Sequence, residues 1–277
     1  MSDISAKSGS ITDSIIDAAG ASGGASLIDL RVGAYWVVVR TSIGAGMASA
    51  LRSEEHLRGH QPIGRAGHLL ELSPVELTRL LRSNSPPEAA IGLAAANALL
   101  GPDVPQLREE KALSILQDRG RGRRVAMIGH FPFADELRGI CEELLVFERG
   151  VNRQPDDLGE ESMKQVLPSA DVVSVTATTL LNRTLPDVLR RVRSDAFLMM
   201  VGPSTPLTPR IFDFGFDVLC GTVLDEPEAV LLAVSQGAVT SQIIGVRRVC
   251  LWNENTKASS EREKGRKGER GNLGHGE

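Results

Sequence analysis

From Arg123 onward the sequence repeats one pattern: a short apolar run, a turn of small or polar residues, and then a stretch with helical spacing. The apolar runs are RVAMI, ELLVFE, DVVSVT, AFLMMVG and DVLCGTVL. Continuous apolar strands that alternate with helices are typical of a parallel sheet covered on both faces, because neither side of such a strand meets water. The pattern therefore predicts an α/β, Rossmann-like domain with a parallel sheet.

The helices between these strands are predicted at Ala134 to Glu143, Thr184 to Arg193 and Pro227 to Ser235, with PRIFDFG as a short turn. The last of them is the best defined, since it starts with a proline and ends before Gly237.

The N-terminal third has a different pattern. SITDSIIDAAG has helical spacing, and SLIDLRVGAYWVVVRTS indicates one or two strands broken near Gly33. RTSIGAGMASA is interpreted as a glycine turn after a strand, and Ser85 to Gly101 as a compact helix begun by prolines and closed by glycine. Together these elements predict a small α+β domain.

Domain boundaries follow from composition. GPDVPQLREEK holds two prolines, a glycine and a cluster of charges, which is typical of a linker. After Trp252 the sequence is charged and almost free of apolar residues, so it cannot bury enough surface to become ordered. We expect an N-terminal domain at 1–105, a Rossmann-like domain at 106–253 and a disordered, dispensable tail at 254–277.

Bulk properties narrow the class of protein. At 277 residues, two domains are the first expectation, and no apolar run is long enough for a membrane-spanning helix. The first residues lack the pattern of a secretory signal, which predicts a cytoplasmic location. A net charge of −4 offers no basic field for nucleic acid. Oligomerisation stays open.

Three cysteines, Cys141, Cys220 and Cys250, are an odd number and form no CxxC pair. This spacing predicts neither a disulfide framework nor a cysteine-rich zinc site, and it favours buried, reduced thiols.

In an open parallel sheet, ligands bind beyond the carboxyl ends of the strands. The loops there, such as GHFPF, TATTLLN and GPSTPLTP, are rich in Gly, Thr, Ser, Asn and Pro, which can hold amides and hydroxyls around a ligand. The same residue types also cap helices, so that alternative stays open. The predicted ligand-binding residues are Gly129, His130, Phe131, Glu148, Thr176, Thr178, Thr179, Asn182, Gly202, Pro203, Ser204, Thr205 and Asn97.

The first of these loops lacks the dinucleotide fingerprint G-x-G-x-x-G, because GHFPFA keeps only Gly129. NAD binding in the usual mode is therefore disfavoured. His130 supplies a titratable donor and Phe131 an apolar wall, which suits a planar ligand with an anionic or carbonyl edge. Glu148, at the end of the second strand, is placed to accept from ribose hydroxyls or, alternatively, pairs with Arg149.

Two further features have a structural as well as a functional interpretation. His56 and His60 have i, i+4 spacing, with His68 further on, but the glycines and proline among them argue against a helix that would gather them at a metal. Asn97 lies in a helix of small apolar residues and is either a buried hydrogen bonder or a group directed into the interdomain cleft.

A resemblance to a known family emerges from six segments: PPEAAIGLAAANALL, VAMIGHFPF, LLVFER, ADVVSVTATTLLNRTL, VGPSTPLTPRIFDFGFDVLCGTVL and AVSQG. Together they resemble the putative heavy-metal chelation domain family, formerly the domain of unknown function 364, with its associated N-terminal domain. The similarity runs from about Ile11 to Val249. It implies an enolase-N-terminal-like α+β domain packed on a Rossmann-like domain, with a site in the cleft between them.

Two functional hypotheses follow. The first is a protein that binds a small molecule or metal chelate, or an enzyme of metal or metal-cofactor metabolism. A soft metal held directly would need clustered Cys, His or Met, which these loops lack, so a chelated metal is the more natural ligand. The alternative is an enzyme that uses a nucleotide-type (adenosyl) cofactor, with Glu148 on the ribose. No catalytic pair is visible, so catalysis and cofactor stay open.

Overall fold

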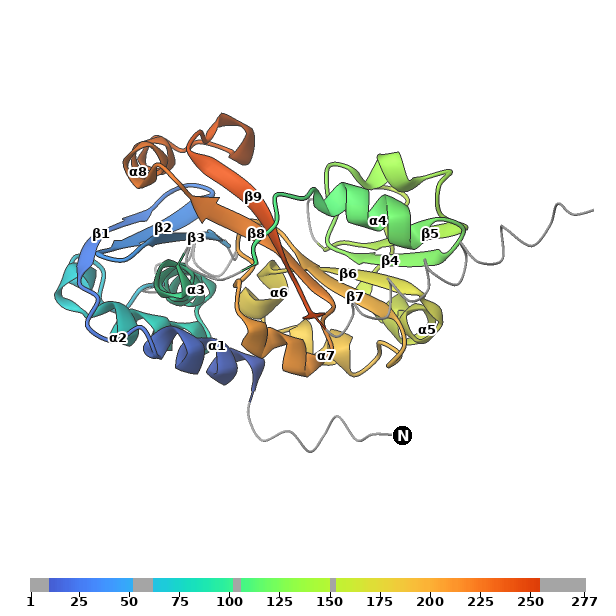
Figure 1. Cartoon of the computed structure of the whole chain (residues 1–277), viewed down its shortest axis with the longest axis horizontal. Coiled ribbons are helices and arrows are strands. Elements are labelled where there is room, and N and C mark those ends of the chain that lie inside the picture. Colours follow the sequence, from blue (N-terminus) through green and yellow to red (C-terminus); the bar gives the residue numbers. More distant parts are fainter. Residues whose placement is uncertain (1–9, 52–61, 102–105, 150–152, 255–277) are drawn as a thin grey trace, which may run out of the picture.

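The computed structural model of the protein describes residues 10–51, 62–101, 106–149 and 153–254. They contain a three-stranded and a six-stranded sheet, which lie in two lobes side by side (Figure 1). We call the described residues up to 101 the N-terminal lobe and those from 106 onward the C-terminal lobe. His56, His60 and the charged tail from 255 onward lie outside the described residues.

The six-stranded sheet has the order β5-β4-β6-β7-β8-β9. Its strands are β4 (Arg124–Ile128), β5 (Glu143–Phe147), β6 (Val172–Thr176), β7 (Phe197–Val201), β8 (Val218–Leu224) and β9 (Val246–Trp252). The strands from β5 to β8 pair in parallel, and β9 pairs antiparallel to β8. The predicted parallel sheet and its five strands are confirmed, whereas the edge strand β9 was not predicted.

Helices cover both faces of this sheet (Figure 1). They are α4 (Ala112–Gly120), α5 (Met163–Val166), α6 (Thr178–Leu181) and α7 (Leu185–Leu189). The helix predicted from Ala134 to Glu143 is wrong: only a 3-10 turn forms at Ala134–Leu137. The winding ends at Arg138, whose backbone is extended, Gly139 follows in a left-handed conformation at φ +84, and β5 already begins at Glu143. The predicted Thr184 helix is shortened to α7, and PRIFDFG is a 3-10 turn, Pro209–Phe214.

The N-terminal lobe combines α1 (Ile11–Gly20), α2 (Pro74–Thr78) and α3 (Pro86–Leu100) with an antiparallel sheet of β1 (Leu27–Val32), β2 (Trp36–Thr41) and β3 (Ala45–Ser49). The predicted α+β class is confirmed, as is the helix closed by Gly101. The interpretation of RTSIGAGMASA as a turn alone is wrong, because its second half is strand β3.

Strand β2 is buried on both faces, which explains its continuous apolar run. Val37 and Val39 pack into the same core as α3, while Trp36 and Val38 pack with the C-terminal lobe's α8 (Pro227–Ser235). Helix α8 has its predicted bounds and lies over the N-terminal sheet (Figure 1). The two lobes therefore share apolar cores. The boundaries at 105 and 253, and the narrower names Rossmann-like and enolase-N-terminal-like, stay predictions.

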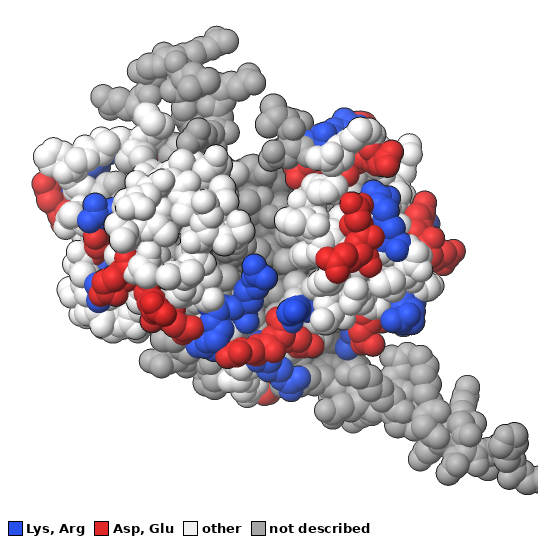
Figure 2. Space-filling view, turned by 90° about the horizontal axis from the view of Figure 1, so that it is seen from above, with Lys and Arg blue, Asp and Glu red and all other residues white. Residues whose placement is uncertain are grey.

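Seen from above, acidic and basic side chains are interspersed on the C-terminal lobe (Figure 2). This face therefore presents no extended field of a single sign. None of the helices in the described ranges combines the length and apolar content that crossing a bilayer requires.

Candidate functional site

The reversal of strand order lies between β4 and β6, because the chain leaves β4 for one edge of the sheet and continues from β6 toward the other. Ligands of open α/β sheets bind at such a point. Gly129 follows β4 at φ +98, and a Cβ atom there would lie 2.9 Å from the Cγ2 atom of Thr176, which ends β6. The loops GHFPF and TATTLLN thus lie side by side, and only glycine fits the first turn.

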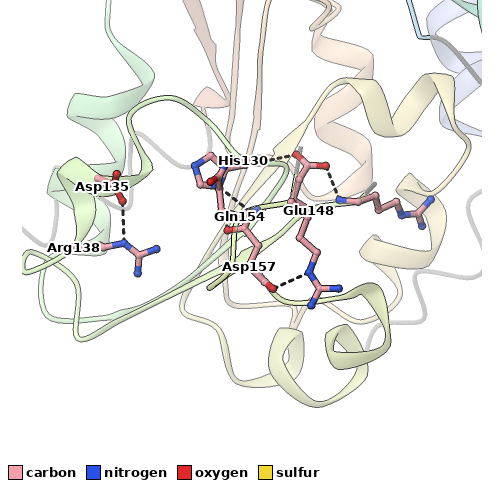
Figure 3. Close-up of polar contacts among 8 residues, drawn as sticks. His130, Asp135, Arg138, Glu148, Gln154 and Asp157 are labelled. Atoms are coloured by element: carbon pink, nitrogen blue, oxygen red, sulfur yellow. Dashed lines mark hydrogen bonds and ion pairs between the residues drawn. The ribbon is translucent and has the colours of Figure 1, made fainter. Parts of the chain in front are cut away.

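His130 is the most constrained polar residue at this turn. Its backbone N–H donates to Glu148 Oε2 at 2.8 Å, and its Nδ1 atom lies 3.0 Å from each carboxylate oxygen of Asp157 (Figure 3). The Asp157 side chain is 0% exposed and that of His130 is 22% exposed. A buried carboxylate therefore fixes an imidazole that reaches the surface.

Asp157 is itself held by its own loop. The backbone N–H of Gln154 donates to Asp157 Oδ2 at 2.8 Å, and Arg153 Nε donates to the Asp157 carbonyl oxygen at 3.0 Å. The next residue, Leu158, pairs with β5 through a bond from its N–H to the Val146 carbonyl at 2.7 Å. The carboxylate thus has two donors and little freedom to turn.

This pairing sets the chemistry of the other ring nitrogen of His130. With Nδ1–H donated to the carboxylate, the neutral imidazole carries its lone pair on Nε2. No described residue forms a hydrogen bond with Nε2. That atom can take a proton, accept a hydrogen bond from a ligand or bind a metal. Carboxylates that orient histidines in this way support catalytic bases and metal-ligating histidines alike.

Glu148 supports the same turn. Its Oε2 accepts from His130 N–H, and its Oε1 accepts from the N–H of Arg149 at 2.7 Å. Both carboxylate oxygens are engaged by backbone amides, although each keeps a second lone pair. Ribose binding by Glu148 stays a prediction.

The threonines after β6 divide into two groups. Thr176 Oγ1 lies 3.1 Å from Thr178 Oγ1, at the reversal of strand order. Thr179 is buried and donates to the Thr176 carbonyl at 2.7 Å, while Asn182 Oδ1 accepts from the N–H and hydroxyl of Thr184. Thr179 and Asn182 therefore form bonds within the local turn, although neither caps α6 or α7, and their contact with a ligand stays a prediction.

The third predicted loop, GPSTPLTP, forms hydrogen bonds that join the two lobes. Ser49 N–H donates to Ser204 Oγ at 2.8 Å, and Asn97 Nδ2 donates to the carbonyls of Met47 and Ser204 at 3.0 and 3.1 Å. Gly202 has φ +126, and the Pro203 carbonyl accepts from Thr222 Oγ1 at 3.1 Å. We call Asn97, Ser204 and Thr205 the junction cluster.

Two atoms of the junction cluster, Asn97 Oδ1 and Thr205 Oγ1, are buried without a hydrogen-bond partner among the described residues. Both residues line a cavity of about 120 Å³, together with Gly44, Thr222 and Asp225. A wider groove of about 500 Å³ includes Met47 and Pro203.

Phe131 stacks on Phe133, with ring centroids 5.4 Å apart and an interplanar angle of 10°. Both rings are partly buried against the core that contains Ala134 and Leu137. Contact between Phe131 and a ligand stays a prediction.

A directly bound metal ion would need several ligating side chains close together. In the part of the chain that the structure describes, no three His, Cys, Asp or Glu side chains are grouped to hold a metal ion. His68 is exposed and lies, through Nδ1, 2.7 Å from Glu71 Oε1.

Sequence reasoning missed Asp157. It lies in NRQPDDLGE, which reads as an ordinary polar turn, and it meets His130 across 27 residues. The sequence carries no local signal for that contact.

Comparison with known families matches both parts of the chain. A family described as "Putative heavy-metal chelation" (DUF364) matches residues 111–252. A second one with the same description (DUF4213) matches residues 13–100.

Similar proteins carry no more specific function. An uncharacterised protein of Methanocaldococcus jannaschii is 25% identical over 202 residues, which cover 71% of this chain and 77% of that protein. A crystal structure of a DUF364 protein of unknown function from Desulfitobacterium hafniense has a TM-score of 0.72 and 25% identity, covering 88% of this chain and 97% of that one. Another from Pyrococcus horikoshii has a TM-score of 0.74 at 22% identity, covering 87% and 99%. The last likeness shows the fold alone.

Proposed function

The protein belongs to the DUF364 family, described as "Putative heavy-metal chelation", and from this premise we propose that it binds a small organic molecule or metal chelate beside His130. The binding place is the carboxyl end of β4 and β6, where the strand order reverses. His130 Nε2 is its central polar contact.

One observation carries this proposal: a fully buried carboxylate, Asp157, holds the Nδ1 side of a surface histidine. Burying a carboxylate costs free energy unless its hydrogen bonds are made. A tight turn after β4 requires Gly129 but no ionisable pair. What the pair contributes is a fixed direction for Nε2, which is useful when a ligand has to meet that atom.

A chelate fits this geometry better than a bare metal ion. Soft and borderline metals take several nitrogen or sulfur ligands from a protein, whereas the turn offers one imidazole nitrogen. In a chelate the organic part already supplies most ligands. His130 then completes the coordination or accepts a hydrogen bond from the chelator, and the hydroxyls of Thr176 and Thr178 lie on the neighbouring strand end.

A nucleotide-type cofactor is the second candidate. Glu148 follows β5 and is bonded to the His130 amide, so its carboxylate lies at the turn where a ribose would be expected. The two candidates differ in which residue matters most: His130 Nε2 for the chelate and Glu148 for the ribose.

The test begins with mass spectrometry of metals and small molecules that copurify with the native protein. Calorimetric titration then compares Fe(III) and Ni(II) salts, the citrate and catecholate complexes of these metals, S-adenosylmethionine and NAD. We expect binding of a chelate in preference to the free salts and to NAD.

The decisive variant is His130→Asn. Its side-chain NH2 lies at about the position of Nδ1, so it keeps the bond to Asp157 and removes only Nε2. We expect chelate binding to weaken by about 1 to 3 kcal/mol, the range for losing one hydrogen-bond partner, with little loss of stability. The control is His68→Asn, an exposed histidine paired with Glu71. Unchanged affinity in His130→Asn, or tight NAD binding by the wild type, would overturn the proposal.

A further inference from the structure

Two of the three cysteines face each other inside the C-terminal lobe. Cys220 on β8 and Cys250 on β9 are direct cross-strand partners. Their Sγ atoms lie 2.6 Å apart, and the residues are 6% and 0% exposed. The sulfur of Cys250 also lies 3.4 Å from the carbonyl oxygen of Glu110.

The backbone around this pair shows which kind of cross-strand pair it is. Cys250 N–H donates to the Arg108 carbonyl at 2.8 Å, and the Cys250 carbonyl accepts from Arg108 N–H at 2.9 Å. Both backbone groups of Cys250 thus point away from β8, so Cys220 and Cys250 form a non-hydrogen-bonded pair. In such pairs the Cα atoms approach to about 4.5 Å, closer than in hydrogen-bonded pairs.

That spacing falls at the short end of the range for disulfides, about 4.4 to 6.8 Å between Cα atoms. The sulfur atoms need to approach by only roughly 0.5 Å to reach the bond length of about 2.05 Å. The backbone therefore already brings the two thiols to bonding position.

We propose that Cys220 and Cys250 form a reversible cross-strand disulfide, with a low-molecular-weight disulfide as the oxidant. One cysteine thiolate attacks the small disulfide, which releases one small thiol and leaves a mixed disulfide on the protein. The second cysteine thiolate attacks the sulfur atom of the first cysteine in this mixed disulfide and releases the other small thiol. The protein loses two electrons and two protons, and the small disulfide becomes two thiols.

Burial makes this reaction slow and selective. The hydrogen bond shared with Cys250, and then burial, hold the pKa of the Cys220 thiol well above its ordinary value, so the thiolate is scarce near neutral pH. Oxidation thus needs an opening of the edge strand β9. Thiol–disulfide exchange runs in both directions, so an excess of small thiol can reduce the bridge again when β9 opens.

The bridge would fasten two segments near the junction cluster. The Cys220 carbonyl accepts from Gly202 N–H at 3.1 Å, in the loop that contains Ser204. Cys250 pairs with Arg108, in the segment before α4, and Trp252 Nε1 donates to Glu110 Oε2 at 2.8 Å. Oxidation would therefore tie β9 and this segment to the strand that supports the Gly202 loop.

The experiment treats the full native chain with glutathione disulfide, blocks remaining thiols with an alkylating agent and analyses the digest by mass spectrometry without reduction. We expect a cross-linked peptide that contains Cys220 and Cys250, loss of two of the three thiols, and recovery of both on adding dithiothreitol. The melting temperature of the oxidised form should rise by several degrees, because a covalent link restricts the unfolded chain.

Cysteine variants identify which two residues form the cross-link. Cys141→Ala should form the same cross-link, whereas Cys220→Ala and Cys250→Ala should not form it. If either of the last two fails to fold, the wild type and Cys141→Ala still decide the matter. Alkylation of all three thiols after long exposure to the oxidant, or glutathione on Cys141 alone, would overturn the proposal.

Discussion

Two polar clusters lie near the carboxyl ends of the parallel strands, and they use their hydrogen-bonding groups in opposite ways. In the junction cluster, Asn97 and Ser204 bond to the backbone of the other lobe, so their polar atoms hold the molecule together. At the turn after β4, Asp157 holds His130 from behind, and Nε2 meets no described residue. The first arrangement uses Asn97 Nδ2 and Ser204 Oγ to join the lobes and leaves Asn97 Oδ1 and Thr205 Oγ1 buried without a described partner, whereas the second leaves the partly exposed His130 Nε2 without one.

The difference teaches how to interpret polar loops. Ser204, Thr205 and His130 lie in loops that contain glycine and small residues, Asn97 lies in α3, and all four were predicted to bind a ligand. Buried polar groups must find partners, so a polar residue in a loop is as often a structural bonder as a binding group. Only the destination of each donor and acceptor separates the two roles. Asn97 and Ser204 form bonds between the lobes, whereas His130 Nε2 has no described partner, and for that reason we propose His130 as the binding residue.

The largest effect that would test this contrast is expected from Asn97→Leu. Leucine has the same branched arrangement of four side-chain heavy atoms but cannot donate, so the carbonyls of Met47 and Ser204 lose their side-chain partner. We expect the free energy of unfolding to fall by about 2 kcal/mol, since each buried group left without a partner costs about 1 to 3 kcal/mol and the buried Asn97 oxygen is removed as well. Urea unfolding followed by circular dichroism measures it.

The affinity of Asn97→Leu for the chelate probes should equal that of the wild type. Weaker binding with unchanged stability would mean that Asn97 contacts the ligand instead of joining the lobes. The contrast between the two clusters would then fail.

Much of the fold could be predicted because buried strands are recognisable in the sequence as continuous apolar runs. Strands β4 and β6 to β8 are apolar almost throughout, since helices cover both faces of the sheet. Strand β9 was missed because it lies at the edge of the sheet and carries Arg247 and Arg248. The helix expected at Ala134 failed because apolar spacing does not reveal that Gly139 adopts a left-handed conformation.

The candidate site was predictable in part. The need for Gly129 and the exposure of His130 follow from a glycine turn after a buried strand. The partner of His130 does not, because Asp157 arrives from a loop whose path depends on Leu158 pairing with β5. Such a contact is a product of tertiary structure and has no pattern in the sequence.

An intermediate effect is expected from Asp157→Asn, which keeps the shape of the side chain but replaces one acceptor oxygen by a donor. The remaining oxygen, in the place of Oδ2, can still accept from the Gln154 N–H and from Nδ1–H of His130, but the amide NH2 then stands in the place of Oδ1, 3.0 Å from Nδ1, and the negative charge that holds the imidazole is lost. We expect about 1 kcal/mol less stability and about tenfold weaker binding of the chelate probe, which corresponds to about 1.4 kcal/mol.

For Asp157→Asn, comparing the loss of binding free energy with the loss of stability distinguishes an orienting role from a structural one. A binding loss clearly larger than that of a stability-matched variant shows that Asp157 acts by orienting His130. Loss of stability alone, with wild-type affinity, would reduce the His130 and Asp157 pair to a structural contact like those of the junction cluster.

The smallest effect is expected from Asn182→Ala, which tests a residue predicted to bind a ligand but found in a local turn. Its Oδ1 accepts from the N–H and the hydroxyl of Thr184, and these bonds lie at the exposed surface. Water can replace the lost acceptor there, so we expect a stability loss of at most about 0.5 kcal/mol, the low end for removing a capping side chain. Chelate affinity should not change, because the Asn182 side chain already has its partner within the turn. Calorimetry on this variant beside His130→Asn checks both statements. A fall in affinity of tenfold or more would mean that the turn at Asn182 reaches the ligand, and the binding surface would then extend past Thr178 along the whole loop after β6.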